Sequence, residues 1–168
     1  LAPFLCFTAE EAWLERYPGD GESVHLRLFP EIPADWRDDA LAAKWSRVRA
    51  VRRVVTGALE IARAEKIIGS SLAAAPRVFL GGADIAALAD VDLAEIAITS
   101  GITLIEGPAP ADAFRLDEVV DVGVVVEIAD GEKCERCWKV LDDVGGDHDF
   151  PGVCGRCADA VRRHPAAA

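Results

Sequence analysis

Two closely spaced cysteine pairs constrain the carboxy-terminal part of this chain more than any other feature. Cys134 and Cys137 enclose two residues, sixteen residues follow, and Cys154 and Cys157 again enclose two. Each CxxC turn can offer two thiolates to one metal ion, and the intervening segment is long enough to fold back and complete a tetrahedron. The spacing therefore predicts a four-cysteine zinc finger or ribbon. Because four protein ligands leave no position for a catalytic water, we expect one structural zinc ion per chain.

Other uses of the four cysteines fit less well. Two disulfides would need an oxidising compartment, and the first residues lack the charged segment and apolar core of a signal peptide. A thioredoxin-like redox site would use one CxxC at the start of a helix, not two equivalent pairs. His148 and His164 are near enough in sequence to replace a ligand, but four cysteines already fill the shell. We interpret both histidines as solvated side chains.

Composition sets the class of protein. With 168 residues and 51% hydrophobic content, the chain can form at least one substantial core. It has no apolar run of membrane-spanning length. Its pI of about 4.7 also disfavours an anionic membrane surface as a partner. We expect a cytoplasmic monomer with no membrane partner.

Charge is distributed unevenly along the chain. The net charge is -11, yet residues 44–66 carry +5. Such a local basic segment is compatible with nucleic-acid binding even in an acidic chain. A plain solvated helix surface is the more frequent explanation of these charges, and contact with an RNA backbone is the sharper one. The candidates for RNA contact in this segment are Arg49, Arg52 and Arg53.

The basic residues around the cysteines allow two interpretations. A zinc ion with four thiolates is formally -2, and neighbouring cations would offset that charge. The same cations could instead contact RNA phosphates. Both roles remain open for Lys133, Arg136, Lys139 and Arg156.

The amino-terminal third is expected to be helical. The chain begins without methionine, so we interpret it as part of a longer protein. Thr8 and Glu11 have the spacing of a capping box, which predicts a helix over 9–16. Cys6 is interpreted as a small core residue. The extended segment 23–33 is expected to pack its apolar side chains against a helical neighbour, namely Val24, Leu26, Leu28 and Phe29.

A long amphipathic helix and then a small mixed module are predicted next. A helix over 38–66 is indicated by apolar residues at spacings of three and four: Trp45, Val48, Val51, Val55, Ala58, Leu59 and Ala62. Beyond it, short apolar runs predict strands at 77–80, 94–100 and 122–129, with a small helix at 84–89. No chemical site is predicted between 81 and 131. The fold class is therefore α+β.

Several stretches together resemble the carboxy-terminal end of bacterial isoleucyl-tRNA synthetases, over nearly the whole chain. The matching stretches are Leu1-Ala2-Pro3, Phe7 to Trp13, Ser23 to Leu26, Phe29-Pro30, a set in the long helix (Trp45, Arg49, Leu59-Glu60, Ala62-Arg63, Lys66), Ile68 to Leu72, and a set in the finger (Cys134, Cys137, Trp138, Cys154 to Cys157). The resemblance implies four parts. These are the end of a helical anticodon-binding domain (1–72), a small α+β junction module (73–131), a zinc finger (132–163) and a frayed tail (164–168).

The resemblance also implies a parent enzyme that activates isoleucine with ATP and transfers it to its tRNA. This end of the protein would hold the anticodon region of tRNA(Ile), alongside the missing amino-terminal domains. The HIGH-like and KMSKS-like signatures of the ATP site do not occur in this sequence. The chain itself is therefore expected to lack catalysis, with ATP bound only in the missing domain.

For individual residues, the resemblance carries the four cysteines over as zinc ligands. Trp138 could cover the metal site or stack on an unpaired anticodon base, and we favour covering. Arg136, Lys139 and Arg156 are candidate phosphate contacts. A DNA-binding finger of a formamidopyrimidine-DNA glycosylase is an alternative, disfavoured by the strands predicted over 73–131. A zinc-stabilised protein-interaction module is a third, and the acidic charge keeps it open.

Overall fold

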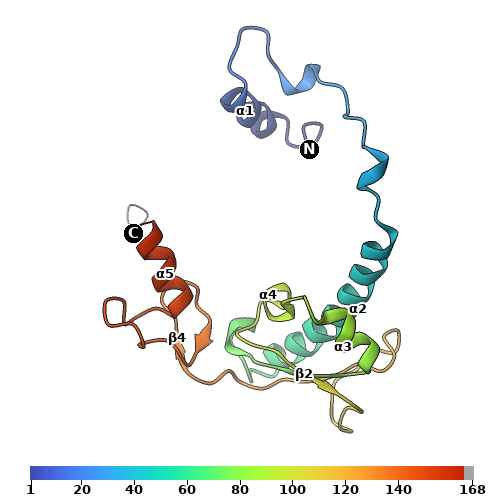
Figure 1. Ribbon diagram of the computed structural model, residues 1–168, viewed down its shortest axis with the longest axis vertical. Helices are drawn as coiled ribbons and strands as arrows, with labels where there is room; N and C mark the ends of the chain where they lie inside the picture. The colour runs from blue at the N-terminus through green and yellow to red at the C-terminus, as the bar shows by residue number, and fades with distance from the viewer. Residues whose placement is uncertain (165–168) are drawn as a thin grey trace. The chain divides into compact units, whose positions relative to one another are not determined.

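The computed structural model describes residues 1–164, so the tail expected at 164–168 lies almost entirely outside the described residues. Contacts divide the chain into two units, Leu1–Asp38 and Asp39–Ala168, and each is described here by itself (Figure 1). The four-part division expected from the resemblance stays a prediction. None of the described helices combines the length and the apolarity that crossing a membrane would need.

The helix of the first unit starts earlier than predicted. Helix α1 spans Cys6–Arg16. Leu5 occupies its N-cap position, and no side chain makes a capping hydrogen bond there. A turn precedes it, in which the Leu5 N–H donates to the Leu1 carbonyl, and the Ala9 N–H then bonds to Leu5 in the helical pattern. The capping box predicted at Thr8 is therefore wrong, because Thr8 already lies within the helix.

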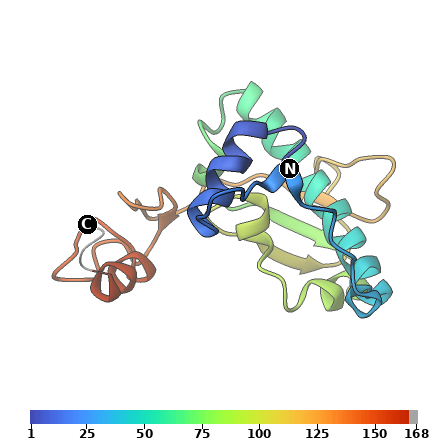
Figure 2. The same cartoon turned by 90° about the horizontal axis from the view of Figure 1, so that it is seen from above.

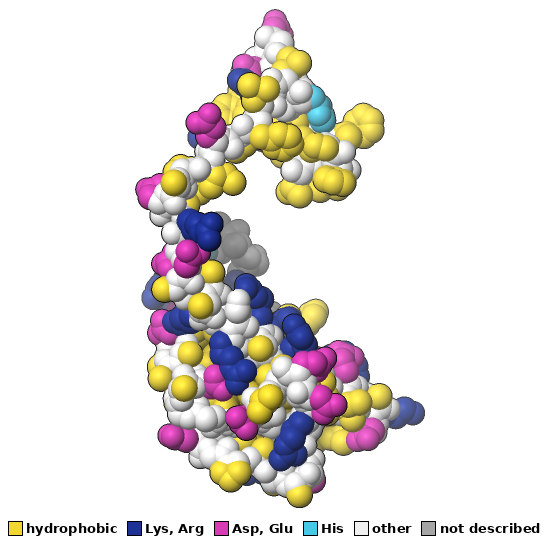
Figure 3. Space-filling model, turned by 90° about the vertical axis from the view of Figure 1, so that its right-hand side faces the viewer, with side chains coloured by type: hydrophobic (Ala, Val, Ile, Leu, Met, Phe, Trp, Pro, Cys, Tyr) yellow, Lys and Arg dark blue, Asp and Glu magenta, His cyan; other side chains and the backbone are white. Residues whose placement is uncertain are grey.

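The first unit encloses no core of its own. Two short 3-10 turns follow α1, η1 over Val24–Leu26 and η2 over Ala34–Trp36, and no residue of 1–38 is buried. Cys6 is exposed, so its interpretation as a core residue is wrong. Leu28 and Phe29 are 93% and 87% exposed, against the expected packing. One helix and two turns cannot surround these side chains, and Figure 3 shows apolar side chains gathered on the surface of this unit.

The long helix predicted over 38–66 is confirmed as α2, Asp39–Ala64. Its apolar stripe is buried as the spacing indicated, with Trp45 half-buried and the following residues buried: Val48, Val51, Val54, Val55, Ala58, Leu59 and Ala62. The helix ends in a turn in which Lys66 has a φ of 61° and the Ile67 N–H bonds to the Ala62 carbonyl. The stripe thus continues to the last turn and faces the sheet of the second unit.

A three-stranded sheet forms the other layer of this core. Strand β1 (Arg77–Leu80) is central, paired in parallel with β2 (Thr103–Glu106) and antiparallel with β3 (Gly123–Val125). Figure 2 shows β1 and β2 side by side. A parallel pair needs a crossover, and two helices make it: α3 (Gly82–Leu88) and α4 (Leu93–Ala97).

The strand predicted over 94–100 is wrong, because this segment forms α4 instead. The Asp92 carboxylate accepts the Glu95 N–H as a side-chain cap, and Leu93 and Ala97 bury the inner face of the helix. These tertiary contacts override the β-propensity of the isoleucines and threonine in the segment. The strand predicted over 122–129 is confirmed only for its first part, and β2 was not predicted.

Close packing joins α2 to the sheet layer. A Cβ built at Gly57 would lie 2.8 Å from the ring of Phe114, so glycine allows that ring to approach the helix. Phe114 in turn bridges to Val124 in β3. On the polar side, the Arg47 guanidinium forms a two-pronged ion pair with Asp84 of α3. The basic helix is therefore an integral wall of this unit.

Candidate metal centre and nucleic-acid interface

Two short strands and one helix position the four cysteines. Strands β4 (Glu132–Lys133) and β5 (Val140–Leu141) form an antiparallel hairpin whose turn contains Cys134 and Cys137. Helix α5 (Gly155–Arg163) begins directly after Cys154, which places Cys157 in its first turn. One pair therefore comes from a hairpin turn and the other from a helix start.

The four thiols form one buried cluster. Their Sγ atoms all lie within 4.8 Å of one another, and Cys134, Cys154 and Cys157 are buried while Cys137 is half-buried. The Sγ atoms of Cys137 and Cys154 are 3.8 Å apart, far beyond the length of a disulfide bond. Sulfur atoms at these separations fit the tetrahedron that four thiolates form around zinc. The cluster therefore fits one structural zinc ion, as the spacing predicted.

The ionisation of the thiols favours a cation at this site. Burial raises the pKa of Cys134, but backbone hydrogen bonds from its neighbours outweigh burial and lower the pKa to about 6. Burial and the adjacent thiols raise the pKa of Cys154 to about 12. Four thiols this close cannot all ionise by themselves, whereas a coordinated dication deprotonates its thiol ligands outright.

Backbone contacts lock the two halves of the finger together. The Glu135 N–H donates to the Gly152 carbonyl at 3.0 Å, and a Cβ at Gly152 would lie 2.5 Å from the Glu135 carboxylate. The Cys154 N–H donates to the Sγ of Cys134 at 3.4 Å. In the connecting loop, Asp147 accepts backbone N–H groups and pairs with Arg162 of α5. The cluster is thus held by bonds that span both cysteine pairs.

Arg136 and Trp138 lie on either side of Cys137 but have different environments. The Arg136 guanidinium lies 3.7 Å from the Sγ of Cys157, which fits the charge-neutralising interpretation of this residue. Trp138 is 61% exposed and has a φ of 66°, and the Lys133 ammonium lies 5.6 Å from its ring centroid. The side chains packed on the cysteine cluster are Leu141, Val144 and Val153. The Trp138 ring is therefore largely accessible to solvent.

Lys139 and Arg156 converge on a residue that the sequence analysis did not identify. The Lys139 ammonium and the Arg156 guanidinium lie 2.7 and 2.9 Å from the same Oε1 atom of Glu95, in α4. Glu95 lies in the segment predicted as a strand, so its position beside the finger was not foreseen. The acidic charge of segment 81–131 was the only available signal, and it did not select one carboxylate among many.

The three arginines proposed on the long helix also differ in their contacts. Arg49 bonds to Ser46 one turn away, at 3.3 Å. The Nε of Arg52 donates to the Ile96 carbonyl of α4 at 2.9 Å, so this arginine supports the fold. Arg53 is exposed on the outer face of α2. On the face of the second unit seen in Figure 3, cationic and acidic side chains alternate.

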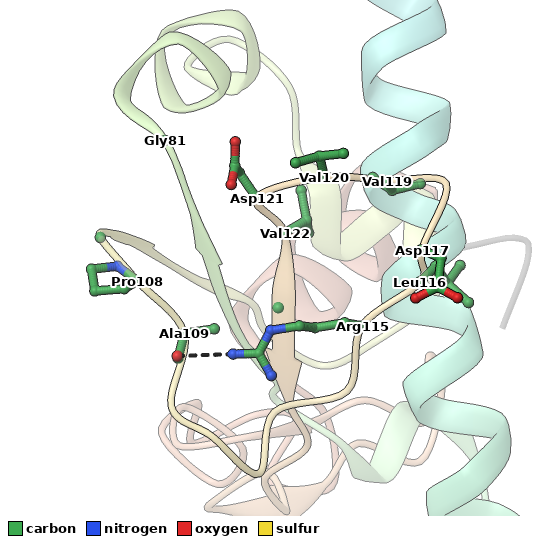
Figure 4. Close-up of a pocket in the computed structure, with 12 residues that line it drawn as sticks. Gly81, Pro108, Ala109, Arg115, Leu116, Asp117, Val119, Val120, Asp121 and Val122 are labelled. Carbon is green, nitrogen blue, oxygen red and sulfur yellow. Dashed lines mark hydrogen bonds between the residues drawn. The ribbon is translucent and has the colours of Figure 1, made fainter.

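A hollow of about 610 Å³ lies beside β3 and the loop that precedes it. Its one guanidinium, Arg115, turns toward the backbone in Figure 4 and donates to the carbonyls of Ala109, Pro110 and Ala113 at 2.7 to 2.9 Å. Those donors hold the loop closed and are not directed at a ligand. Among the described residues that line the hollow, none is a histidine or a cysteine. The hollow therefore gives no reason to assign a catalytic site to this loop.

Comparison with known proteins explains the combination of these parts. Residues 1–78 match the family described as the anticodon-binding domain of tRNA ligase, and 131–160 match the zinc finger found in FPG and IleRS. The isoleucine–tRNA ligase of Agrobacterium fabrum is 58% identical over 163 residues, which cover 96% of this chain and 17% of that ligase. That of Ruegeria pomeroyi is 59% identical over 162 residues, with the same coverage of both chains.

The resemblance to bacterial isoleucine–tRNA ligases is confirmed. It covers nearly the whole chain, whereas the chain spans only 17% of the length of these relatives. The finger alone would also suit the DNA glycosylases, but the anticodon-binding match over 1–78 disfavours that alternative. The α+β fold class and the four-cysteine finger are confirmed as well.

Proposed function

We propose that this chain is the tRNA-binding carboxy-terminal portion of an isoleucine–tRNA ligase. It would hold the anticodon region of tRNA(Ile) while missing amino-terminal domains bind ATP and perform aminoacylation. The observation that carries this proposal is the pairing, in one chain, of an anticodon-binding region at 1–78 with a finger at 131–160. We further propose that the protein acts in the cytoplasm as a monomer.

The residues best suited to meet RNA are those with exposed groups that are not bonded to another helix, to a strand or to a cysteine of the cluster. Trp138 offers an exposed ring, and an adjacent lysine places positive charge where a nucleotide would stack. Arg53 and Arg49 offer guanidinium groups on the outer face of α2, suited to phosphates. Arg136 and Arg52 are assigned secondary roles, because one faces a zinc ligand and the other a backbone carbonyl.

Trp138→Ala should reduce discrimination between isoleucine tRNA and a tRNA with another anticodon, by about fivefold to tenfold. Loss of one base–aromatic stack costs about 1–3 kcal/mol, and only part of that depends on the base. Zinc content should remain one ion per chain, since the Trp138 side chain is 61% exposed and the cysteine cluster is lined by other residues. Fluorescence titration with both tRNAs, beside metal analysis of the same samples, measures both quantities.

Trp138→Phe is the matched control, because it keeps an aromatic face at the same position. It should retain most of the discrimination. Suppose instead that Trp138→Ala loses zinc and that the molecules which still contain zinc discriminate normally between the two tRNAs. That result would establish covering of the metal as the role of Trp138.

Deleting residues 132–168 from the full-length ligase should leave isoleucine-dependent adenylate formation nearly unchanged. Aminoacylation of tRNA should fall about tenfold or more. A tenfold fall corresponds to a loss of roughly 1.4 kcal/mol in transition-state stabilisation. The two activities are measured by pyrophosphate exchange and by charging of tRNA. Equal loss of both would indicate a folding defect and would contradict a role confined to tRNA.

A further inference from the structure

The finger is joined to the rest of its unit by a short chain segment, residues 127–131. The start of this segment is bonded to the chain just before β1. The Ala75 N–H donates to the Glu127 carbonyl and the Ala129 N–H donates to the Ala73 carbonyl, both at 2.9 Å. Gly131 follows with a φ of 107°. Figure 1 shows this segment leading from the module to β4. Beyond this covalent connection, the finger contacts the rest of the unit through side chains.

Two sets of contacts oppose rotation about this segment. One is Ser100, which is 8% exposed, donates its hydroxyl to the Leu72 carbonyl and accepts the Val140 N–H of β5 at 2.7 Å. The other is the Glu95 clasp, defined as Glu95 with Lys139 and Arg156. The finger is thus held at its hairpin and at both of its cysteine turns.

The clasp differs from an ordinary surface ion pair in three ways. Its two cations come from different cysteine turns, so one carboxylate links both halves of the finger to α4. The Lys139 side chain is only 14% exposed. Glu95 lies on a helix that is itself anchored, by its buried Leu93 and Ala97 and by Arg52 from α2. The two cations also lower the pKa of the Glu95 carboxyl, Lys139 more than Arg156.

We infer that Glu95 is a positioning residue that fixes the orientation of the zinc finger on the module, and that Lys139 acts in this clasp and is not an RNA ligand. Arg156 is 66% exposed and is bound to Glu95 through one terminal nitrogen. The consequence for tRNA binding rests on the function proposed above. A finger free to rotate would pay an entropic cost when it docks on the anticodon arm.

The test compares Glu95→Gln, which removes the charge and keeps the shape, with Glu65→Gln, an equal charge change at the exposed end of α2. In the wild-type chain, residual dipolar couplings of the module and the finger should fit a single alignment tensor. In Glu95→Gln the couplings of the finger should shrink and require their own tensor. Zinc content and the melting temperature should stay near wild type, because other residues form the thiol cluster and the core between α2 and the sheet. A single tensor for Glu95→Gln would overturn the inference.

tRNA affinity supplies the functional readout. Glu95→Gln should weaken binding of isoleucine tRNA about fivefold, whereas Glu65→Gln should leave the affinity near wild type. Tighter binding by Glu95→Gln would overturn the inference, because it would show that Glu95 merely occupies cations that tRNA needs. If the wild-type chain binds no tRNA, the proposed function fails, while the dipolar couplings still decide the role of Glu95.

Discussion

Cys154→Ser should abolish stoichiometric zinc binding and unfold the finger. Apparent binding free energies at structural zinc sites of this kind are about 10–16 kcal/mol, and that energy is folding energy because the site does not exist in the unfolded chain. Serine is a good helix N-cap, so loss of α5 could not be attributed to the start of the helix. Metal analysis under reducing conditions and amide hydrogen exchange measure the two effects. Exchange protection should vanish over 132–163.

The matched control is Cys6→Ser, which alters an exposed cysteine remote in sequence from the cluster. It should keep one zinc ion per chain and normal protection. Helix α2 and the sheet should remain protected in Cys154→Ser, because their core of Val51, Leu80 and Val124 is separate from the thiol cluster. Equal loss of protection in α2 would contradict this independence. Wild-type protein without zinc would contradict the metal assignment itself.

Gly131→Ala should destabilise the finger by about 3 kcal/mol or more, through strain and a clash together. Gly131 has a φ of 107°, a region that side-chain-bearing residues rarely adopt. A Cβ there would lie 2.5 Å from the Leu141 carbonyl oxygen, so the backbone of β5 would have to move. Chemical denaturation followed by a signal from the finger measures the loss, and zinc affinity should fall with it.

Gly145→Ala measures the backbone strain of a positive φ without the steric clash. Gly145 also has a positive φ, 88°, but the atom nearest to a Cβ at this position would be the Pro151 carbonyl oxygen, at an ordinary 3.8 Å. This variant should cost only about 1–2 kcal/mol, the strain alone. Equal effects of the two substitutions would show that the contact with β5 relaxes without cost.

Regular spacings in the sequence allowed correct prediction of several elements of the structure. The cysteine spacing predicted the metal centre, because two CxxC turns impose their own local geometry. The stripe in α2 was predicted because seven apolar residues repeat at helical spacing over a 26-residue helix. Strand β1 was likewise foreseen from a short apolar run. In each case the determining information lies within neighbouring residues or in a repeated spacing.

Other parts depended on contacts between residues distant in sequence. Segment 94–100 has β-branched residues, but its first part lies in α4 because Leu93 and Ala97 are buried in the core of the second unit. Cys6 and the apolar residues of segment 23–33 are of types that are often buried. The first unit has one helix and two short turns, which are too few elements to enclose these side chains.

The sequence by itself predicted the four-cysteine cluster, the long amphipathic helix and the resemblance to isoleucine–tRNA ligases, because cysteine spacing, helical period and sequence similarity are all local or cumulative signals. Only the tertiary structure decided which of the predicted RNA-contact residues are bonded to other parts of the protein. It directs Lys139 and Arg156 to Glu95, Arg136 to a zinc ligand and Arg52 to a carbonyl of α4, while leaving Trp138 exposed. The physical reason is that a charge or ring acquires its role from the partner within a few ångströms, and Glu95 lies 44 residues before Lys139 and 61 before Arg156.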